Sequence, residues 1–343
     1  MKTIEKTWSN FRERWGTLGV VLLVLVLLLL SCCVSTLAFG MVVLRTGSTA
    51  TPIPTGTPVP IDTPTLTGTP IPTDTPTPTV ETLEGLQVHV LDVSQGDAIL
   101  ILPPDDGAIL IDGGNAGSEV VEYLLTQGVE RLAMVVATHP HADHIGGLVD
   151  VLEAMPVEEV VTNGHPHTTQ TYERFLDAIA SARAIYTEVG RGDTLQVGNL
   201  TLDVLHPPGD FAGEGLNNNS LVLRLVHGDV VFLFLGDAER EAEESMIASG
   251  RDLGATVLKV GHHGSRTSSS PMFLERVQPE VAIYCCGLDN RYGHPHAETL
   301  AALADVGAEV YGTDVNGTVT ITSDGTNYIV DVARQGQPRA PTE

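Results

Sequence analysis

Residues 139–144 read His-Pro-His-Ala-Asp-His, so three imidazoles and one carboxylate occur within six positions. The apolar stretch Leu132–Thr138 (LAMVVAT) precedes them and predicts a buried β-strand, while Ile145–Leu148 looks like the start of a helix. Ionisable groups at the end of a buried strand are costly unless a strong partner satisfies them. Imidazole nitrogen and carboxylate oxygen suit Zn²⁺ or Mn²⁺. The segment therefore predicts a metal site rather than a solvated polar loop.

The spacing within this segment predicts two metal positions. In an extended chain His139 and His141 point to the same side, because successive side chains of a strand alternate between its faces. Asp143 and His144 come after a turn and can reach a second position. We therefore expect two adjacent divalent cations, either Zn²⁺ or Mn²⁺.

Six segments in one order resemble the metallo-β-lactamase superfamily, and within it the metallo-hydrolase domain of ComEC-type competence proteins. Residues 139–144 fit the superfamily signature HxHxDH. The other five segments are similar to signatures of the ComEC-type branch: Leu91–Leu100 (LDVSQGDAIL), Leu110–Gly114 (LIDGG), Phe234–Asp237 (FLGD), Leu258–Ser265 (LKVGHHGS) and Tyr292–Pro295 (YGHP). Ser94 departs from the pattern, which usually has glycine there. The resemblance extends from about Leu86 to the 320s.

Apolar β-type runs and helix-like patterns follow one another from Gly85 onward, which predicts a layered α/β architecture. The resemblance implies a four-layer αββα sandwich, which we expect over residues 85–335, before a short tail at 336–343. The predicted strands are Leu86–Val93, Ala98–Leu102, Ala108–Ile111, Leu132–Ala137, Leu200–Leu205, Leu221–Val226, Val230–Leu235, Thr256–Val260, Val281–Tyr284, Val319–Thr322 and Tyr328–Val332. The predicted helices are Ser118–Thr126, Ile145–Glu153, Thr171–Ala182, Glu239–Ala248, Pro271–Val277 and Glu298–Val306.

The N-terminal quarter of the chain predicts a tethered domain. Residues 18–44 are apolar and uncharged, long enough to span a bilayer, which needs about 20 residues. The basic residues lie before them, in residues 1–17, so we expect a cytoplasmic N-terminus and an extracytoplasmic C-terminal domain. Residues 45–84 are rich in threonine and proline and predict an extended linker. Alternatively, Leu29–Cys32 resembles a lipoprotein cleavage box, with Cys32 as the anchor.

Two later segments complete the expected metal site. Asp237 follows the apolar run Val230–Leu235, where a carboxylate can hold two cations about 3.5–4 Å apart. The resemblance implies that a histidine of the pair His262–His263 binds the second metal; His263 aligns best, but either can fill the role. The third ligand of the first metal is also open, because Asp210 stands where relatives usually have histidine.

Further residues are expected to support or contact the reacting groups. The resemblance implies that Asp112 orders the ligand loop, and we expect Asp97 to support the ligands as well. Lys259 is expected to neutralise developing charge. The residues expected in catalysis are Asp143, His263, Lys259 and His294, and those expected on the substrate side are Asn219, Ser220, Ser265 and His294.

Two cations at such a site would activate water, so hydrolysis is the expected reaction class. The resemblance implies a phosphodiesterase with DNA as a candidate substrate. The charge opposes this, because 18 basic residues against 43 acidic ones give a net charge of −25, which repels polyanions. The alternatives are a hydrolase of a cell-wall phosphodiester, lactam or lactone, and a non-catalytic metal-stabilised binding module. The sequence indicates no protein partner.

Overall fold

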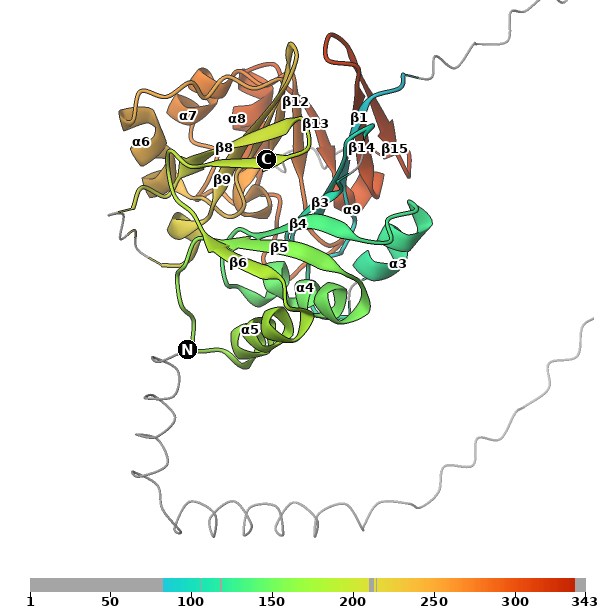
Figure 1. Cartoon of the computed structure of the whole chain (residues 1–343). Coiled ribbons are helices and arrows are strands. Elements are labelled where there is room, and N and C mark those ends of the chain that lie inside the picture. Colours follow the sequence, from blue (N-terminus) through green and yellow to red (C-terminus); the bar gives the residue numbers. More distant parts are fainter. Residues whose placement is uncertain (1–82, 106, 118, 210–212, 214, 337–343) are drawn as a thin grey trace, which may run out of the picture. The chain divides into compact units, whose positions relative to one another are not determined.

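The computed structural model describes residues 83–336, apart from 106, 118, 210–212 and 214 (Figure 1). The expected cytoplasmic tail, membrane span and Cys32, nearly all of the linker, and Asp210 lie outside the described residues. Within the part of the chain that is described, no helix has the length and hydropathy needed to cross a membrane.

The first sheet has eight strands in the order β15-β14-β1-β2-β3-β4-β5-β6. Strands β3 to β6 are parallel to one another and the remaining pairs are antiparallel. The strands are β1 (Leu86–Val90), β2 (Ile99–Leu102), β3 (Ile109–Ile111), β4 (Leu132–Ala137), β5 (Val157–Thr162), β6 (Ile185–Glu188), β14 (Val319–Ser323) and β15 (Tyr328–Val332). The segment 139–144 directly follows the carboxyl end of β4.

The second sheet has seven strands in the order β13-β12-β11-β10-β9-β8-β7. Strands β10 to β13 are parallel, and β7 to β10 are antiparallel neighbours. The strands are β7 (Thr194–Val197), β8 (Leu200–His206), β9 (Val222–His227), β10 (Val230–Phe234), β11 (Val257–Lys259), β12 (Val281–Tyr284) and β13 (Glu309–Gly312). The loops after β10 and β11 carry Asp237 and the pair His262–His263.

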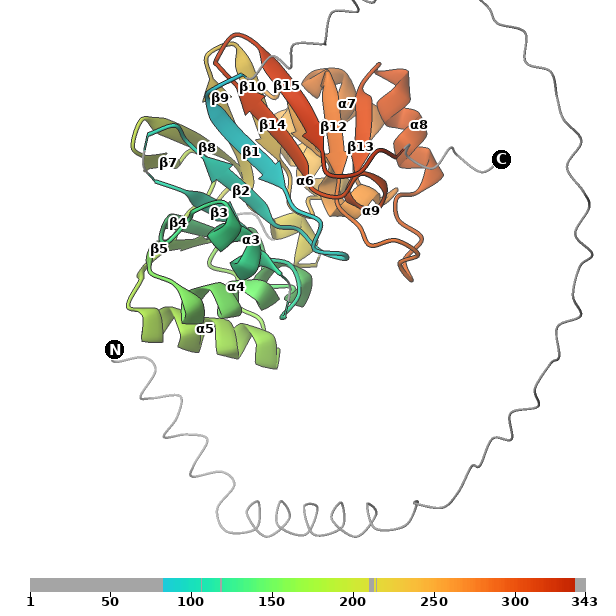
Figure 2. The same cartoon turned by 90° about the vertical axis from the view of Figure 1, so that its right-hand side faces the viewer.

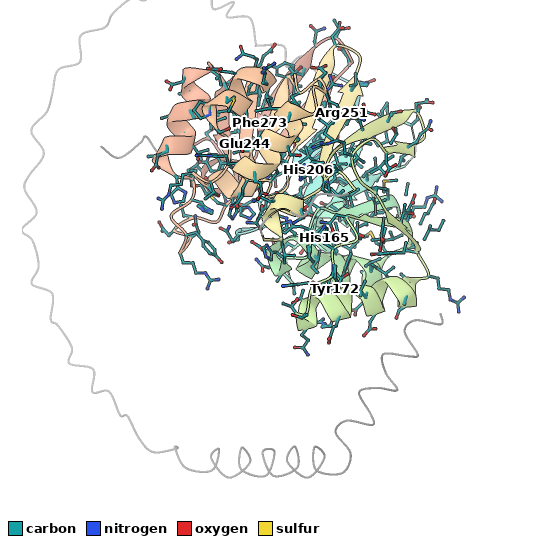
Figure 3. The ribbon with its side chains drawn as sticks, turned by 90° about the vertical axis from the view of Figure 1, so that its left-hand side faces the viewer. His165, Tyr172, His206, Glu244, Arg251 and Phe273 are labelled. Carbon is teal, nitrogen blue, oxygen red and sulfur yellow. The ribbon has the colours of Figure 1, made fainter. Side chains whose placement is uncertain are left out.

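Helices cover the outer face of each sheet, so the expected four-layer order is present (Figures 1 and 2). The first sheet is covered by α3 (Val120–Thr126), α4 (Ala142–Ala154) and α5 (Gln170–Ala182), and the second by α6 (Arg240–Ala248), α7 (Pro271–Val277) and α8 (Ala297–Asp305). A short helix, α9 (Thr313–Asn316), follows β13. Tyr172 of α5 and Phe273 of α7 lie in the two outer layers (Figure 3).

The alternation of side chains along each strand builds the separate apolar layers. Ile109 and Ile111 of β3 belong to the cluster between the sheets, whereas Leu110 belongs to the cluster under the helices of the first sheet. Likewise Phe232 faces the other sheet and Leu233 faces α6 and α7. Strands buried on both faces need continuous apolar runs, which explains why the sequence marks them so clearly.

His89 on β1 gives the folded chain a predictable dependence on acid. Burial lowers the pKa of this histidine to about 4. As pH falls from about 6.5 towards 4, the unfolded chain binds a proton that the folded chain does not, so the free energy of unfolding falls. This contribution is fully present above pH 6.5. It is lost on acidification and amounts to at most about 3 kcal/mol.

The substitution His89→Gln is therefore expected to flatten the pH dependence of stability. Urea unfolding of the chelator-treated chain between pH 4 and 7 measures it, with the wild type as reference. His206, whose pKa burial also lowers to about 4, remains in both proteins. Parallel curves for the two proteins would contradict a depressed pKa at His89.

Candidate metal centre

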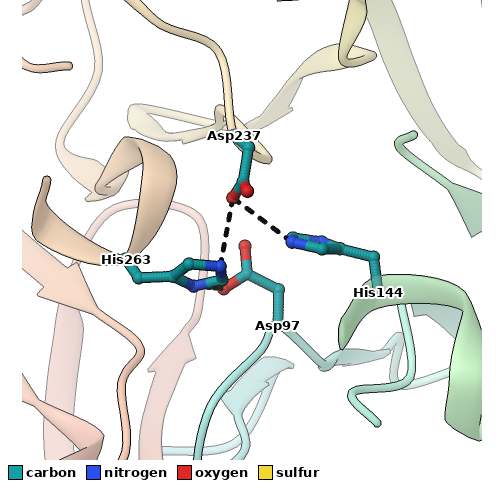
Figure 4. A group of neighbouring side chains, drawn as sticks. All are labelled: Asp97, His144, Asp237 and His263. Carbon is teal, nitrogen blue, oxygen red and sulfur yellow. Dashed lines mark ion pairs between the residues drawn. The ribbon is translucent and has the colours of Figure 1, made fainter. Parts of the chain in front are cut away.

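The candidate ligands converge from loops that follow parallel strands of both sheets. Helix α4 begins at Ala142, three residues before the predicted start, so Asp143 and His144 lie in its first turn. A carboxylate there is favourable because the N-terminus of a helix carries a partial positive charge. Figure 4 shows His144, Asp237, His263 and Asp97 pointing towards one another, with dashed lines from Asp237 to the two imidazoles.

The carboxylate of Asp237 lies at the centre of the cluster. Its Oδ1 is 3.3 Å from His144 Nε2 and 3.4 Å from His263 Nε2. Its Oδ2 is 3.6 Å from His139 Nε2. Among the described residues, His144 Nε2, His263 Nε2 and Asp237 Oδ1 are buried atoms with no hydrogen-bond partner. Converging buried polar atoms without partners fit a bound cation, since unsatisfied groups of this kind are otherwise costly.

Two groups of side chains could each hold a metal ion, and Asp237 belongs to both. One group is Asp97, His144, Asp237 and His263; the other is His139, His141 and Asp237; within each, the candidate ligand atoms all lie within 4.8 Å of one another. His139 Nε2 and His141 Nδ1 are 2.9 Å apart. Asp143 Oδ2, which is partly exposed, lies 3.4 Å from His263 Nε2. Asp237 is thus the residue common to both candidate groups.

Asp112 fixes the orientation of His144. Its Oδ2 lies 2.8 Å from His144 Nδ1 and accepts a hydrogen bond of 2.7 Å from Thr138 Oγ1. Its Oδ1 accepts a 2.8 Å bond from the Thr138 backbone N–H. Because a carboxylate accepts at Nδ1, a proton resides there, and Nε2 of His144 faces Asp237, where it would bind a cation once its own proton is released. Asp112 therefore has the supporting position expected for it.

Asp97 and the carbonyl of Cys285 hold His263 in the same manner. His263 Nδ1 is 3.1 Å from the Cys285 oxygen and 3.3 Å from Asp97 Oδ1. Lys259 Nζ donates to Asp97 Oδ2 at 2.5 Å. Although Asp97 lies within one candidate metal group, its contacts support the ligand His263, in line with the expected supporting role.

The charges within the cluster determine which imidazoles carry an extra proton, and a bound cation would displace that proton. Burial is the largest single effect and lowers the pKa of His144 and His263, but the surrounding carboxylates, first among them Asp237, together raise both pKa values well above the ordinary value. Burial and the neighbouring His144 lower the pKa of His139 well below its usual range. Metal binding requires neutral imidazoles, so binding would release protons from His144 and His263.

Lys259, which was expected to neutralise developing charge, lies inside the protein beside Asp97. Both Lys259 and Asp97 are only 1% exposed. The ammonium donates to Asp97 Oδ2 and to the Val260 carbonyl, at 2.5 and 2.9 Å. Asp97 holds the pKa of Lys259 above its ordinary value although burial lowers it. Lys259 is therefore connected to the candidate metal centre through Asp97, and its role in catalysis stays a prediction.

Three residues expected on the substrate side also form hydrogen bonds to other parts of the protein. Ser220 is fully buried and its Oγ accepts the backbone N–H of Asp237 at 3.2 Å, which positions that carboxylate. Asn219 is buried, with Nδ2 donating to the carbonyls of Gly213 and Gly215 at 3.1 and 2.7 Å. Ser265 is buried with its Oγ 3.0 Å from Thr267 Oγ1. These hydroxyls and this amide thus form hydrogen bonds with neighbouring residues of the protein.

His294 remains beside the cluster, where a substrate-side residue was expected. Its ring stacks near those of His263 and Tyr292, at centroid distances of 6.2 and 5.7 Å. Burial and the charges of His263 and His262 lower its pKa to about 4, so the ring is neutral near pH 7. The neutral ring can donate from one nitrogen and accept at the other.

Sequence reasoning missed two partners of His262. Glu239 Oε1 lies 2.8 Å from His262 Nδ1, and Asn217 Nδ2 lies 3.3 Å from His262 Nε2. Glu239 directly follows the loop of Asp237, so its position two residues after that aspartate was the available signal. Asn217 carried no such signal.

The family follows from the matched sequence model. Residues 91–288 match the metallo-beta-lactamase superfamily, and the chain belongs to that superfamily. This span contains residues 139–144, Asp237 and His263.

The relatives found among curated proteins confirm the resemblance to ComEC-type competence proteins. "ComE operon protein 3" of Bacillus subtilis (strain 168) is 33% identical over 253 residues, covering 68% of this chain and 32% of the relative. "Recombination protein 2" of Haemophilus influenzae is 33% identical over 243 residues, covering 68% and 28%. "Competence protein ComA" of Neisseria gonorrhoeae is 30% identical over 233 residues, covering 67% and 31%. The chain thus matches about a third of the length of these relatives.

Proposed function

We propose that this chain is a phosphodiesterase that uses two divalent cations, Zn²⁺ or Mn²⁺, to cleave DNA, and that residues 18–44 tether it to the outer face of the cell membrane. The observation that carries the proposal is the position of Asp237, whose two oxygens face different histidines. A carboxylate shared between two metal positions is characteristic of two-metal hydrolytic sites. Its relatives in competence proteins support DNA as the substrate.

In this proposal the cations, when bound, supply electrophilic activation of the phosphoryl group and of water. The protein residues would hold these cations and orient the imidazoles that bind them. Asp112 and Asp97 fix the imidazoles of His144 and His263 with Nε2 towards Asp237. We assign Asp143 Oδ2 the role of accepting a proton from the attacking water. Burial raises the pKa of Asp143, but His263 and His144 together lower it by more than burial raises it. The carboxylate is therefore ionised at neutral pH.

A cationic and aromatic rim beside the site supports a nucleic-acid substrate. The exposed guanidinium of Arg291 lies over the ring of Tyr292, with Cζ 4.9 Å from the centroid, and Tyr292 stacks on His294. The hydroxyl of Tyr292 accepts a hydrogen bond from Arg291 Nη2 at 2.7 Å and raises the pKa of the guanidinium. A guanidinium suits phosphate oxygens, and aromatic rings suit unpaired bases.

The charge of the chain favours a second candidate. A net charge of −25 repels a long polyanion but has less effect on a small ester. A cell-wall phosphodiester, a lactam or a lactone would then be the substrate, and the same side chains would hold the cations.

Cleavage assays on the full chain separate these candidates. The chelator-treated protein is restored with Mn²⁺ or Zn²⁺ and given single- and double-stranded DNA, bis(p-nitrophenyl) phosphate and nitrocefin. We expect DNA cleavage that depends on metal and falls at least about 10²-fold in Asp143→Ala. His227→Ala, at the far end of β9, serves as the control.

Other outcomes are equally informative. Hydrolysis of the small diester without DNA cleavage would support the cell-wall candidate, and turnover of nitrocefin would favour a lactamase. A folded, metal-loaded protein that hydrolyses none of them would indicate a binding module.

A further inference from the structure

We infer that His262 supplies a further ligand to the metal position of His139 and His141, and that Glu239 is the carboxylate that orients it. The inference rests on the two-cation site proposed above. It also answers the question left by Asp210, which stands where superfamily members usually carry a histidine for this position.

The adjacent histidines His262 and His263 lie nearest to different oxygens of Asp237. His263 Nε2 lies 3.4 Å from Oδ1, the oxygen that also faces His144. His262 Nε2 lies 4.0 Å from Oδ2, the oxygen that also faces His139. Two ligands of one Zn²⁺, each at about 2.0–2.1 Å from the ion, stand no more than about 4.2 Å apart. His262 Nε2 and Asp237 Oδ2 are therefore close enough to bind one ion. His262 lies outside the group of His139, His141 and Asp237, whose ligand atoms are all within 4.8 Å of one another, so its ring has to move towards these histidines to complete that position.

An unusual backbone turns both imidazoles towards Asp237. His262 has φ 46° and ψ 48°, and His263 has φ 56° and ψ 24°, so both residues are left-handed. Non-glycine residues rarely adopt this conformation, and two in succession persist only where the surroundings demand it. The two neighbouring rings, with centroids 5.9 Å apart, therefore face different oxygens of the Asp237 carboxylate.

The surroundings of His262 repeat those of the other histidines. Glu239 Oε1 lies 2.8 Å from His262 Nδ1 and accepts a 2.8 Å hydrogen bond from Thr267 Oγ1. The same arrangement occurs in the pairs of His144 with Asp112 and His263 with Asp97, described above. In each pair a carboxylate lies at Nδ1 and Nε2 points towards Asp237, which is how protein sites prepare imidazole for a metal.

Other candidates for this role are engaged elsewhere. His206, the histidine nearest in sequence to the expected loop, is fully buried (Figure 3). Its Nε2 lies 2.8 Å from the Asn218 carbonyl oxygen, so that nitrogen is already bonded within the fold. Asn217 Nδ2 lies 3.3 Å from His262 Nε2, a long contact that a cation would replace.

Metal content and affinity test the inference without any activity measurement. The full chain is treated with chelator and titrated with Zn²⁺ by calorimetry, and bound metal is counted by mass spectrometry. His262→Asn is the first variant, because asparagine tolerates the left-handed backbone better than most residues. We expect two equivalents for wild type and about one tight equivalent for His262→Asn. Glu239→Gln should keep two, with one affinity weakened about 10–100-fold.

The controls separate the possible failures. His227→Ala should behave as wild type, and His262→Ala repeats the test without an amide oxygen able to bind the metal. Two equivalents of wild-type affinity in both His262 variants would overturn the inference while the two-metal proposal stands. Fewer than two equivalents in the wild type would overturn the proposed two-cation site itself. If one His262 variant fails to fold, as judged by circular dichroism, the metal content and affinity of the other variant and of Glu239→Gln test the inference.

Discussion

Replacing Asp237 by asparagine is expected to lower hydrolysis at least about 10³-fold, because it removes the carboxylate shared by both candidate metal groups. Asparagine offers one neutral carbonyl oxygen where aspartate offers two charged ones. It therefore cannot present an anionic oxygen to both the metal position beside His144 and the one beside His139. Cations contribute several kcal/mol of transition-state stabilisation, and each 1.4 kcal/mol is about tenfold in rate. The bound metal should fall by at least one equivalent.

Asp237→Asn is nearly isosteric, so the fold should persist and the two readouts can be compared directly. The rate is measured on the substrate that the assays above identify, and metal is counted on the same preparation. Asp252→Asn is a suitable control, because Asp252 is an exposed aspartate paired with Arg224 at 2.8 Å. A variant that retains both metal equivalents and wild-type turnover would show that Asp237 only caps the loop after β10.

The interior strands were predictable from sequence because they are buried on both faces. The interior strands at 132–137 and 281–284 were predicted to the residue, and so was the edge strand at 328–332. Continuous runs such as Val230–Leu235 have no polar face, so the pattern indicates a strand between two layers. The helix at Ala142 was placed too late, since His144 and Asp143 were interpreted as a loop. Ligand residues inside a first helical turn interrupt the apolar pattern on which such predictions depend.

The strands that sequence reasoning missed are mostly at sheet edges. β6, β7 and β13 are all terminal strands in the sheet orders. An edge strand has one unpaired side and is often short and polar, so it carries few apolar residues. β6 (IYTE), for example, has no buried residue. β5 was missed because two glutamates interrupt its run, VEEVVT.

In the site, sequence indicated which residues gather but not which of them face solvent. The histidines and aspartates were found because clustered ligands at strand ends imply a metal. The burial of Ser220 and Lys259 was not predictable, because a hydroxyl or ammonium near a motif can point outward or inward. Only packing decides this, and here both point inward. Glu239 was overlooked for the same reason, since its significance comes from its distance to His262.

The ion pair of Lys259 and Asp97 gives the largest expected effect on stability. Lys259→Met keeps the aliphatic length but removes the charge, which leaves the carboxylate of Asp97 buried without its cation. Removing one partner of a buried pair typically costs about 3–5 kcal/mol. We therefore expect the free energy of unfolding of the chelator-treated chain to fall by about that amount, as measured by urea titration. Metal affinity should also fall, because Asp97 then holds His263 less firmly.

A surface pair provides the matched control for this experiment. Arg224→Met breaks the pair with Asp252, whose side chain is 75% exposed, so water solvates the remaining carboxylate. Such pairs contribute about 0–1 kcal/mol, and the variant should unfold near the wild-type midpoint. If Lys259→Met instead kept wild-type stability and metal content but lost turnover, the ammonium would act on substrate as the sequence first suggested. Its burial between the Val260 carbonyl and Asp97 argues for the structural outcome.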